Sequence, residues 1–421
     1  MSSKKKDEED KKNSMLYISF NQDNSFFAIG TEKDFYIYKA DDLEKGSYKG
    51  EMKGGIGIVE MVENSNFLIL AGGGEKPKFD KKQVIIWDDF EKKIICELKF
   101  STEIKLVQYK KNYLFVICQK RIYIFNFDTF ENICSIDTGN NTKELIAINK
   151  NESPLLIAYP SENKENEIEI MDYLNKENNN KVLINFNDSV SKISMNNDGR
   201  LIVSANGHGT IIRIHSCKYG TLLMEFKRGI EKAIINTICF DNESNLMAVS
   251  SSKGTIHIFA MRSTFNKLNE IEKQNPIDDF KIITKNDKNK KKNKDENKIE
   301  ENPQDNKNGE NKNENIIDNN NEIKNENIIN NEEKNEQNNI NINNKSPGDD
   351  ISIENSKSLF GHTEKSFAKV RLKSVDSICA FIKTSELVVV TSDSNWYIYK
   401  IDLQKGGDCE KQKGKKIELN K

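Results

Sequence analysis

Two adjacent cations, Lys227 and Arg228, end a strand-like stretch and stand directly before a glycine. Neighbouring side chains on an extended strand point to opposite faces, so these two charges cannot hold one phosphate from the same side. We therefore expect each cation to serve a separate pocket.

The turns before and after this pair contain the same chemical groups. The stretches "SANGHGTIIR" (204–213) and "SSSKGTIHIF" (250–259) each combine hydroxyl side chains, a glycine amide and either Arg213 or His257. Phosphate oxygens accept charge-assisted hydrogen bonds from donors of this kind. The alternative is that the two cations form ordinary surface salt bridges. The duplicated turn favours two phosphate-binding pockets.

The elements that position these residues belong to seven copies of one sequence repeat. Each copy has a short apolar strand, a polar turn, a second strand of small and branched residues, another turn and a third strand that alternates in period two. The first-strand anchors are Ile18, Ile58, Leu106, Ile146, Ile193, Ile238 and Ile378. Their separations are 40, 48, 40, 47, 45 and 140 residues, and a four-stranded propeller blade needs about 40 to 45. The sequence predicts an all-β, seven-bladed β-propeller, because two unrelated β-sandwiches would not give so steady a period.

The long last separation reflects a low-complexity insert in the sixth blade. So polar a tract of Asn, Lys and Glu cannot bury enough apolar area to offset its ordering entropy, and we expect it to be disordered. The last repeat has three clear strands, so the N-terminal segment is expected to supply its fourth. The predicted division is a disordered tail at 1–14, blades one to six at 15–265, the insert at 266–358, the end of blade six and blade seven at 359–404, and a polar tail at 405–421.

The bulk composition excludes several functions. A net charge of −2 over 421 residues gives no overall field toward nucleic acid or an anionic membrane, so anion recognition must be local. The seven cysteines stand singly, which favours reduced thiols in a cytosolic protein over disulfides or a zinc site. The charged N-terminus lacks a signal-peptide core, and no apolar run approaches the ~20 residues of a membrane span.

Catalytic patterns are also missing from the sequence. We find no nucleophile with its base and no paired carboxylates, and "GGGEKPKF" at Gly72 leads into no phosphate-binding helix. His208 and His257 stand beside Gly-Thr turns, whereas His215 and His362 are interpreted as structural or solvated. The sequence predicts a monomeric, non-enzymatic protein with no cofactor and no metal.

The run from Leu201 to Phe259, with "FKRG" at 226–229, resembles the PROPPINs, seven-bladed propellers that bind phosphoinositides and act in autophagy and are called WIPI proteins in animals. The resemblance includes "SFAKVRL" at Ser366 and covers nearly all of the chain outside the N-terminal tail and the insert. The "GGGEKPKF" and "IWDD" stretches are most similar to the branch of the third and fourth human WIPI paralogues.

The resemblance implies two phosphoinositide sites, one on each side of "FKRG". The first site would use Ser204, Gly209, Thr210, Arg213 and Lys227. The second site would use Arg228, Gly229, Ser251, Thr255 and His257. Two residues depart from the family pattern: Lys227 replaces an arginine and cannot make its bidentate grip, and Asn206 stands where many relatives have serine. We expect the first site to be the weaker one.

The resemblance also implies a cellular role. Family members recognise phosphatidylinositol 3-phosphate and the 3,5-bisphosphate and dock edge-on to membranes. We therefore expect a cytoplasmic protein recruited peripherally to phagophore (preautophagosomal) or endosomal membranes, with an autophagy lipid-transfer scaffold as partner on blades two and three. The alternative is a WD-type interaction scaffold without lipid binding. In the family, the blade-six loop carries a membrane-inserting segment. Here its isoleucine pairs (282–283, 316–317 and 328–329) have a thin apolar face and are interpreted as compositional drift.

Overall fold

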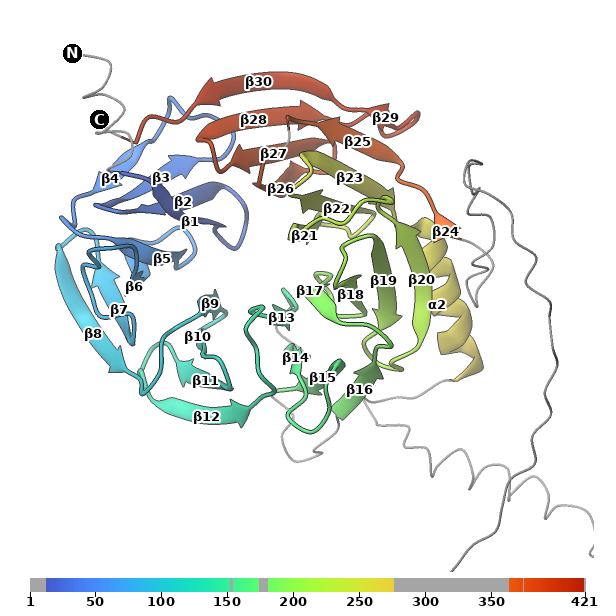
Figure 1. Ribbon diagram of the computed structural model, residues 1–421, viewed down its shortest axis with the longest axis horizontal. Coiled ribbons are helices and arrows are strands. Elements are labelled where there is room, and N and C mark those ends of the chain that lie inside the picture. The colour runs from blue at the N-terminus through green and yellow to red at the C-terminus, as the bar shows by residue number, and fades with distance from the viewer. Residues whose placement is uncertain (1–12, 152–153, 174–180, 276–362, 374, 420–421) are drawn as a thin grey trace, which may run out of the picture. The chain divides into compact units, whose positions relative to one another are not determined.

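Each of the seven repeats forms one sheet with four antiparallel strands, and the sheets stand side by side around a ring (Figure 1). In blades five and six a short fifth strand is added in parallel. The computed structural model describes residues 13–151, 154–173, 181–275, 363–373 and 375–419. The predicted seven-bladed β-propeller is confirmed. Six of the seven anchors lie within the first strand of their sheet, and Ile146 directly precedes its strand.

The first four blades each contain four strands in chain order. Blade one has β1 (Met15–Phe20), β2 (Phe26–Thr31), β3 (Phe35–Lys39) and β4 (Tyr48–Gly50). Blade two has β5 (Ile56–Met61), β6 (Phe67–Gly72), β7 (Gln83–Asp88) and β8 (Lys93–Lys99). Blade three has β9 (Leu106–Lys110), β10 (Tyr113–Ile117), β11 (Arg121–Asn126) and β12 (Asn132–Asp137). Blade four has β13 (Ala147–Ile148), β14 (Leu156–Pro160), β15 (Glu167–Asp172) and β16 (Lys181–Asn185).

Blades five and six combine strands from both sides of the insert, whereas all strands of blade seven follow it. Blade five has β17 (Val190–Met195), β18 (Leu201–Asn206), β19 (Ile211–Ser216), β20 (Leu222–Lys227) and the short β24 (Thr363–Glu364). Blade six has β21 (Ile235–Phe240), β22 (Leu246–Ser251), β23 (Thr255–Ala260), β25 (Ala368–Arg371) and β29 (Gly407–Asp408). Blade seven has β26 (Ser377–Lys383), β27 (Glu386–Thr391), β28 (Asn395–Lys400) and β30 (Glu410–Lys416).

The second strand of each blade is buried along nearly its whole length, as in β18 and β22. Such strands are short continuous apolar runs because both faces of each sheet pack against a neighbouring sheet. Seven hydrophobic clusters result, one between each pair of adjacent blades, including the pair formed by blades seven and one. The core of this fold is therefore divided into seven interfaces around the ring.

Blade seven is completed by β30, which pairs with β28. The predictions of an N-terminal fourth strand and of a polar tail at 405–421 are therefore wrong, since β1 belongs to blade one. All seven residues of β30 are exposed. An outer strand of this kind needs no apolar alternation, so its sequence "EKQKGKK" gave no strand signal.

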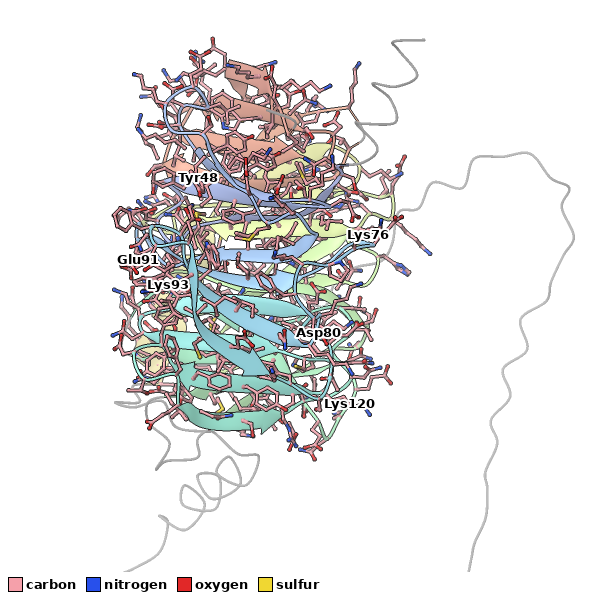
Figure 2. All side chains as sticks on the ribbon, turned by 90° about the vertical axis from the view of Figure 1, so that its left-hand side faces the viewer. Tyr48, Lys76, Asp80, Glu91, Lys93 and Lys120 are labelled. Carbon is pink, nitrogen blue, oxygen red and sulfur yellow. The ribbon has the colours of Figure 1, made fainter. Side chains whose placement is uncertain are left out.

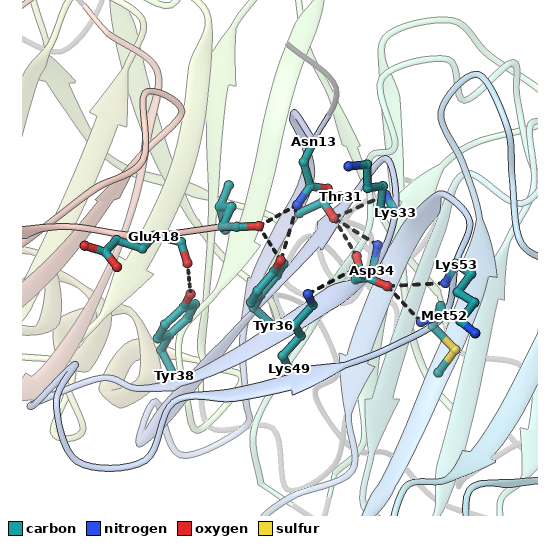
Figure 3. Close-up of polar contacts among 11 residues, drawn as sticks. Asn13, Thr31, Lys33, Asp34, Tyr36, Tyr38, Lys49, Met52, Lys53 and Glu418 are labelled. Atoms are coloured by element: carbon teal, nitrogen blue, oxygen red, sulfur yellow. Dashed lines mark hydrogen bonds and ion pairs between the residues drawn. The ribbon is translucent and has the colours of Figure 1, made fainter. Parts of the chain in front are cut away.

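The two ends of the described chain meet on blade one (Figure 3). The carbonyl oxygen of Leu419 accepts hydrogen bonds from the Asn13 Nδ2, at 2.5 Å, and from the Tyr36 hydroxyl. The Tyr38 hydroxyl donates to the carbonyl of Glu418 at 3.2 Å. These contacts tie blade seven to blade one beside their shared apolar cluster.

The insert leaves blade six after its third strand and returns as its fourth, β25, as predicted for a loop within this blade. Its expected start at residue 266 is wrong, because α2 (Arg262–Gln274) continues the folded part of the chain. Leu268 of α2 is buried in the cluster between blades five and six, and Arg200 binds Glu272 at 2.9 Å. The remainder of the predicted insert up to residue 358, the N-terminal tail up to residue 12 and the three isoleucine pairs lie outside the described residues.

Successive turns alternate between the two faces of the ring, because the first four strands of each blade are antiparallel. Figure 2 shows Tyr48, Glu91 and Lys93, next to the turns between third and fourth strands, along one face. Lys76 and Asp80, between the second and third strands of blade two, lie at the other. The turns between second and third strands in blades five and six, which carry the predicted site residues, thus share one face.

Candidate functional site

Lys227 and Arg228 diverge at the end of β20. Lys227 is exposed and lies opposite Ile211 in the sheet, on the same face as Arg213 and Glu225. Arg228 follows directly, is 5% exposed, and donates its backbone N–H to the Thr210 carbonyl at 2.9 Å. The two cations therefore point toward different neighbouring blades, as strand geometry predicts.

The Arg228 side chain bridges blades five and six. Its Nε donates to the Gly209 carbonyl, and its Nη2 donates to the Glu231 carbonyl. Its Nη1 lies 3.5 Å from the Ser251 Oγ of blade six. Burial lowers the pKa of this guanidinium, but arginine stays charged in proteins. Gly209 was assigned to the first site by sequence, and its carbonyl is engaged by the arginine of the second.

The first predicted site contains a cation that already has two partners. Arg213 Nε donates to Glu225 Oε1 and its Nη1 to Asp188 Oδ1, both at 2.7 Å. Ser204 lies opposite Arg213 in the sheet and is buried. An anion at this site would have to compete with two carboxylates for Arg213. Among the predicted residues of the first site, Lys227 is then the cation that adds uncompensated positive charge.

The turn that carries the first site is held by Asn206. The Asn206 Oδ1 accepts hydrogen bonds from the backbone N–H groups of Thr210, at 2.9 Å, and Ile211, at 3.1 Å. Its Nδ2 lies 3.3 Å from the Thr210 Oγ1. Gly209 has a φ of 64°, and a Cβ there would lie 2.1 Å from the Ala233 carbonyl oxygen. The asparagine and the glycine together fix this turn before any ligand arrives.

The second predicted site lies on the face of blade six that is turned toward blade five. Thr255 and His257 stand opposite Arg371 and Lys369 of β25, and residues opposite each other in an antiparallel pair share a face. Phe259, two residues after His257 and on the same face, packs against Phe226 of blade five with the ring centroids 4.6 Å apart.

Lys369 and Arg371 were not predicted as site residues, although their segment "SFAKVRL" was noticed for its resemblance. Two cations at positions i and i+2 of a strand lie on one face, and this signal could have found them. Arg371 Nε binds Asp408 Oδ1 at 3.1 Å, and both side chains are largely exposed. Together with Arg228 these residues give the second site three cations beside hydroxyl groups.

His257 is buried among these cations. It is 8% exposed, and burial, followed by repulsion from Lys369, Arg228 and Arg371, lowers its pKa to about 4. Its Nδ1 has no hydrogen-bond partner among the described residues. The imidazole is therefore neutral at pH 7, and an anion placed here would raise its pKa.

The remaining predicted residues differ in their surroundings. Gly229 is not required sterically by its described neighbours, because a Cβ there would meet none of their atoms within 4 Å. His208 is exposed. His215 is buried with its ring edge-on to Phe186, and burial lowers its pKa to about 4, in keeping with a structural role. His362 lies outside the described residues.

Fold and site together define a β-propeller with a basic inter-blade surface on its fifth and sixth blades. The PROPPIN family model matches residues 14–275, and the chain belongs to this family. Within the described residues, no helix is long and apolar enough to cross a bilayer.

Individual relatives support this assignment. The chain is 30% identical over 289 residues to SVP1-like protein 2 of Saccharomyces cerevisiae, a match that covers 61% of this chain and 64% of the relative. It is 30% identical over 279 residues to autophagy-related protein 18 of Yarrowia lipolytica, covering 61% and 69%. The solved structure of Kluyveromyces lactis Hsv2 superposes with a TM-score of 0.62 at 18% identity, covering 96% of this chain and all of that one. The chain thus spans less than two thirds of the length of the S. cerevisiae relative.

Proposed function

We propose that this chain is a non-enzymatic effector that binds phosphatidylinositol 3-phosphate, phosphatidylinositol 3,5-bisphosphate or both, and acts in autophagosome formation or endosomal trafficking. The observation that carries the proposal is the basic face of blade six. It places Arg228, Lys369 and Arg371 around Ser251 and Thr255, at the boundary with blade five. Such a set of charged and hydroxyl donors suits a phosphate monoester.

The two sites differ in strength in this proposal. The second site has an excess of cations, since Asp408 is the only carboxylate that pairs with any of the three among the described residues. In the first site, Glu225 and Asp188 already neutralise Arg213. Lys227 then binds as a point charge. Occupation of both sites by one membrane raises the residence time through effective concentration.

The loop after "FKRG" supplies an apolar contact with the bilayer. Ile230 is 87% exposed and Ile234 is 70% exposed, and both lie within six residues of Arg228. Lys232 of the same loop is exposed, and Lys253 approaches the loop through Glu231 at 3.0 Å. Isoleucine side chains flanked by lysines suit the interface of an anionic membrane. The propeller would then dock with this edge toward the lipid.

A protein partner is proposed on blades two and three. The outer strand of blade two and the turn before it expose Phe90, Ile94 and Ile95, and the outer strand of blade three exposes Ile133. Adjacent exposed apolar side chains mark interaction surfaces. We propose that the partner is an autophagy lipid-transfer scaffold and that the chain belongs to the branch of the third and fourth human WIPI paralogues. We also propose that the chain acts as a monomer, which is recruited from the cytoplasm to phagophore or endosomal membranes.

Liposome co-sedimentation tests the lipid function. At low salt, the full chain should pellet with vesicles that contain phosphatidylinositol 3-phosphate or the 3,5-bisphosphate and stay in solution with vesicles that contain phosphatidylinositol. If neither phosphorylated lipid pellets the protein, the alternative of a lipid-independent interaction scaffold replaces this proposal.

A further inference from the structure

A polar cavity lies on the face of the ring opposite the turns that carry the proposed sites of Lys227 and Arg228. It has a volume of about 300 Å³ and is formed by the turns between the first and second strands of four consecutive blades. These turns border the first strands, which line the middle of the ring in Figure 1. The lining residues are all polar or charged, and they are Gln22, Asp23, Glu63, Asn64, Lys110, Lys111 and Lys150.

Two of these lysines are partly buried and have no direct ion-pair partner among the described residues, although Asp23 acts on Lys150 through space. Lys110 and Lys150 have no ion pair with any described residue, and both are shielded from solvent. Burial, followed by repulsion from Lys150 and Lys111, lowers the pKa of Lys110 to about 7. Burial likewise lowers the pKa of Lys150. The burial of both lysines, with the repulsion that Lys150 and Lys111 exert on Lys110, favours a bound anion.

The carboxylates of the cavity come from the turns of blades one and two, whereas its lysines come from blades three and four. Asp23 is held by the backbone N–H of Ser25, at 2.9 Å, and by Asn64 Nδ2, at 3.0 Å. The backbone N–H of Glu63 donates to Gln22 Oε1 at 2.8 Å. The turns are therefore fixed by their own hydrogen bonds, and the carboxylates keep acceptor capacity for hydroxyl donors.

We propose that this cavity binds a small phosphorylated polyol, with its phosphate at Lys110 and Lys150 and its hydroxyl groups at Asp23 and Glu63. The volume lies at the lower end of the range for small-molecule sites. The lining has none of the apolar side chains that form the centre of a protein interface or contact a lipid chain. The proposal does not depend on the phosphoinositide sites, which lie on turns at the opposite face.

Isothermal titration of the full chain with glucose 6-phosphate at low salt tests the site. We expect saturable one-site binding, weaker binding of inorganic phosphate and none of glucose. Lys110→Gln and Lys150→Gln should each weaken binding roughly tenfold or more, as expected for loss of one charge-assisted contact. Lys120→Gln is the matched control, because Lys120 is exposed and lies at the opposite face (Figure 2).

Two further measurements distinguish binding in this cavity from binding at the proposed phosphoinositide sites. Arg228→Ala should leave glucose 6-phosphate binding unchanged, and a loss there would assign the signal to the phosphoinositide sites and overturn the proposal. Binding should weaken as the pH rises above 7, because Lys110 loses its proton and with it a positive charge at the phosphate. Asp23, Glu63, Lys111 and Lys150 also face the cavity. Absence of binding by the wild-type chain, or capture of polyglutamate in place of the sugar phosphate, would also overturn it.

Discussion

Thr255 and Arg371 lie directly opposite each other on β23 and β25, although the whole insert separates them in the chain. The return strand of the insert therefore completes the basic face that begins with Arg228. The proposed site, which the sequence places in the motif "FKRG" and its two flanking turns, therefore also includes residues beyond the insert.

The two cations of the motif should differ in their effect on lipid binding. Arg228→Ala should weaken binding to phosphatidylinositol 3-phosphate vesicles by tenfold or more, since it removes charge-assisted hydrogen bonds of about 1.5–3 kcal/mol. Lys227→Ala should weaken it only two- to threefold, and Lys227→Arg should tighten it. Vesicle titration measures the lipid affinity of all three variants. Because Arg228 also binds the Gly209 carbonyl, Arg228→Lys and thermal unfolding must accompany the alanine variant. Equal losses at both positions would contradict the asymmetry.

The return strand should contribute to the same site. Lys369→Ala and Arg371→Ala should each lower vesicle affinity by roughly threefold to tenfold, because each removes a cation from the face shared with Thr255. Lys383→Ala is a matched control, since Lys383 is exposed on blade seven and pairs with Glu386. If the two variants bind like this control, β25 has no part in lipid recognition.

The loop after the motif should affect membranes and soluble headgroups differently. Ile230→Asp and Ile234→Asp should reduce vesicle binding roughly tenfold each, because burial of an isoleucine side chain contributes about 1–2 kcal/mol. Affinity for soluble inositol 1,3-bisphosphate, measured by calorimetry, should stay unchanged. Ile133→Asp, an exposed isoleucine on blade three, should alter neither quantity. Vesicle binding that survives both loop substitutions would argue against insertion of this loop.

His257 should make the fold sensitive to acid. Its pKa of about 4 in the folded chain lies below the ordinary value of about 6.5, so the unfolded chain binds more protons between these values. Stability is then fully present above pH 6.5 and is lost as the pH falls toward 4, by up to about 2 kcal/mol at pH 5. Urea unfolding of His257→Gln should show a shallower loss between pH 7 and 5 than wild type. His208→Gln, at an exposed position, should follow the wild type, and an unchanged slope in His257→Gln would refute the assignment.

Two deletions should separate the insert from the ring. Removal of residues 285–344 should leave cooperative thermal unfolding near the wild-type midpoint, because the strands on both sides of the insert remain. Removal of residues 405–421 should abolish or strongly weaken cooperative unfolding, since it takes away β30 and the Leu419 contacts with Asn13 and Tyr36. The opposite pattern would mean that the insert is part of the folded core.

Sequence periodicity predicted the ring because every blade repeats the same buried second strand. Even Ile146, the one anchor that lies outside the first strand of its blade, directly precedes that strand. Periodicity failed at β30, whose residues are all exposed and carry no apolar pattern. It also failed at α2, where Leu268 packs on blade five from within a polar stretch. Strand geometry predicted the divergence of Lys227 and Arg228, but Lys369 and Arg371 join the site through a pairing that a single sequence does not encode locally.

The position of β30 also sets the order in which the ring can assemble during synthesis. Blades one to four, four of the five strands of blade five and three strands of blade six have been made once Ala260 has been synthesised. At about 5–20 residues per second, the ribosome needs roughly 8–30 seconds more to reach β30. During that interval the faces of blades one and six that later contact blade seven have no partner. A longer insert prolongs this open stage.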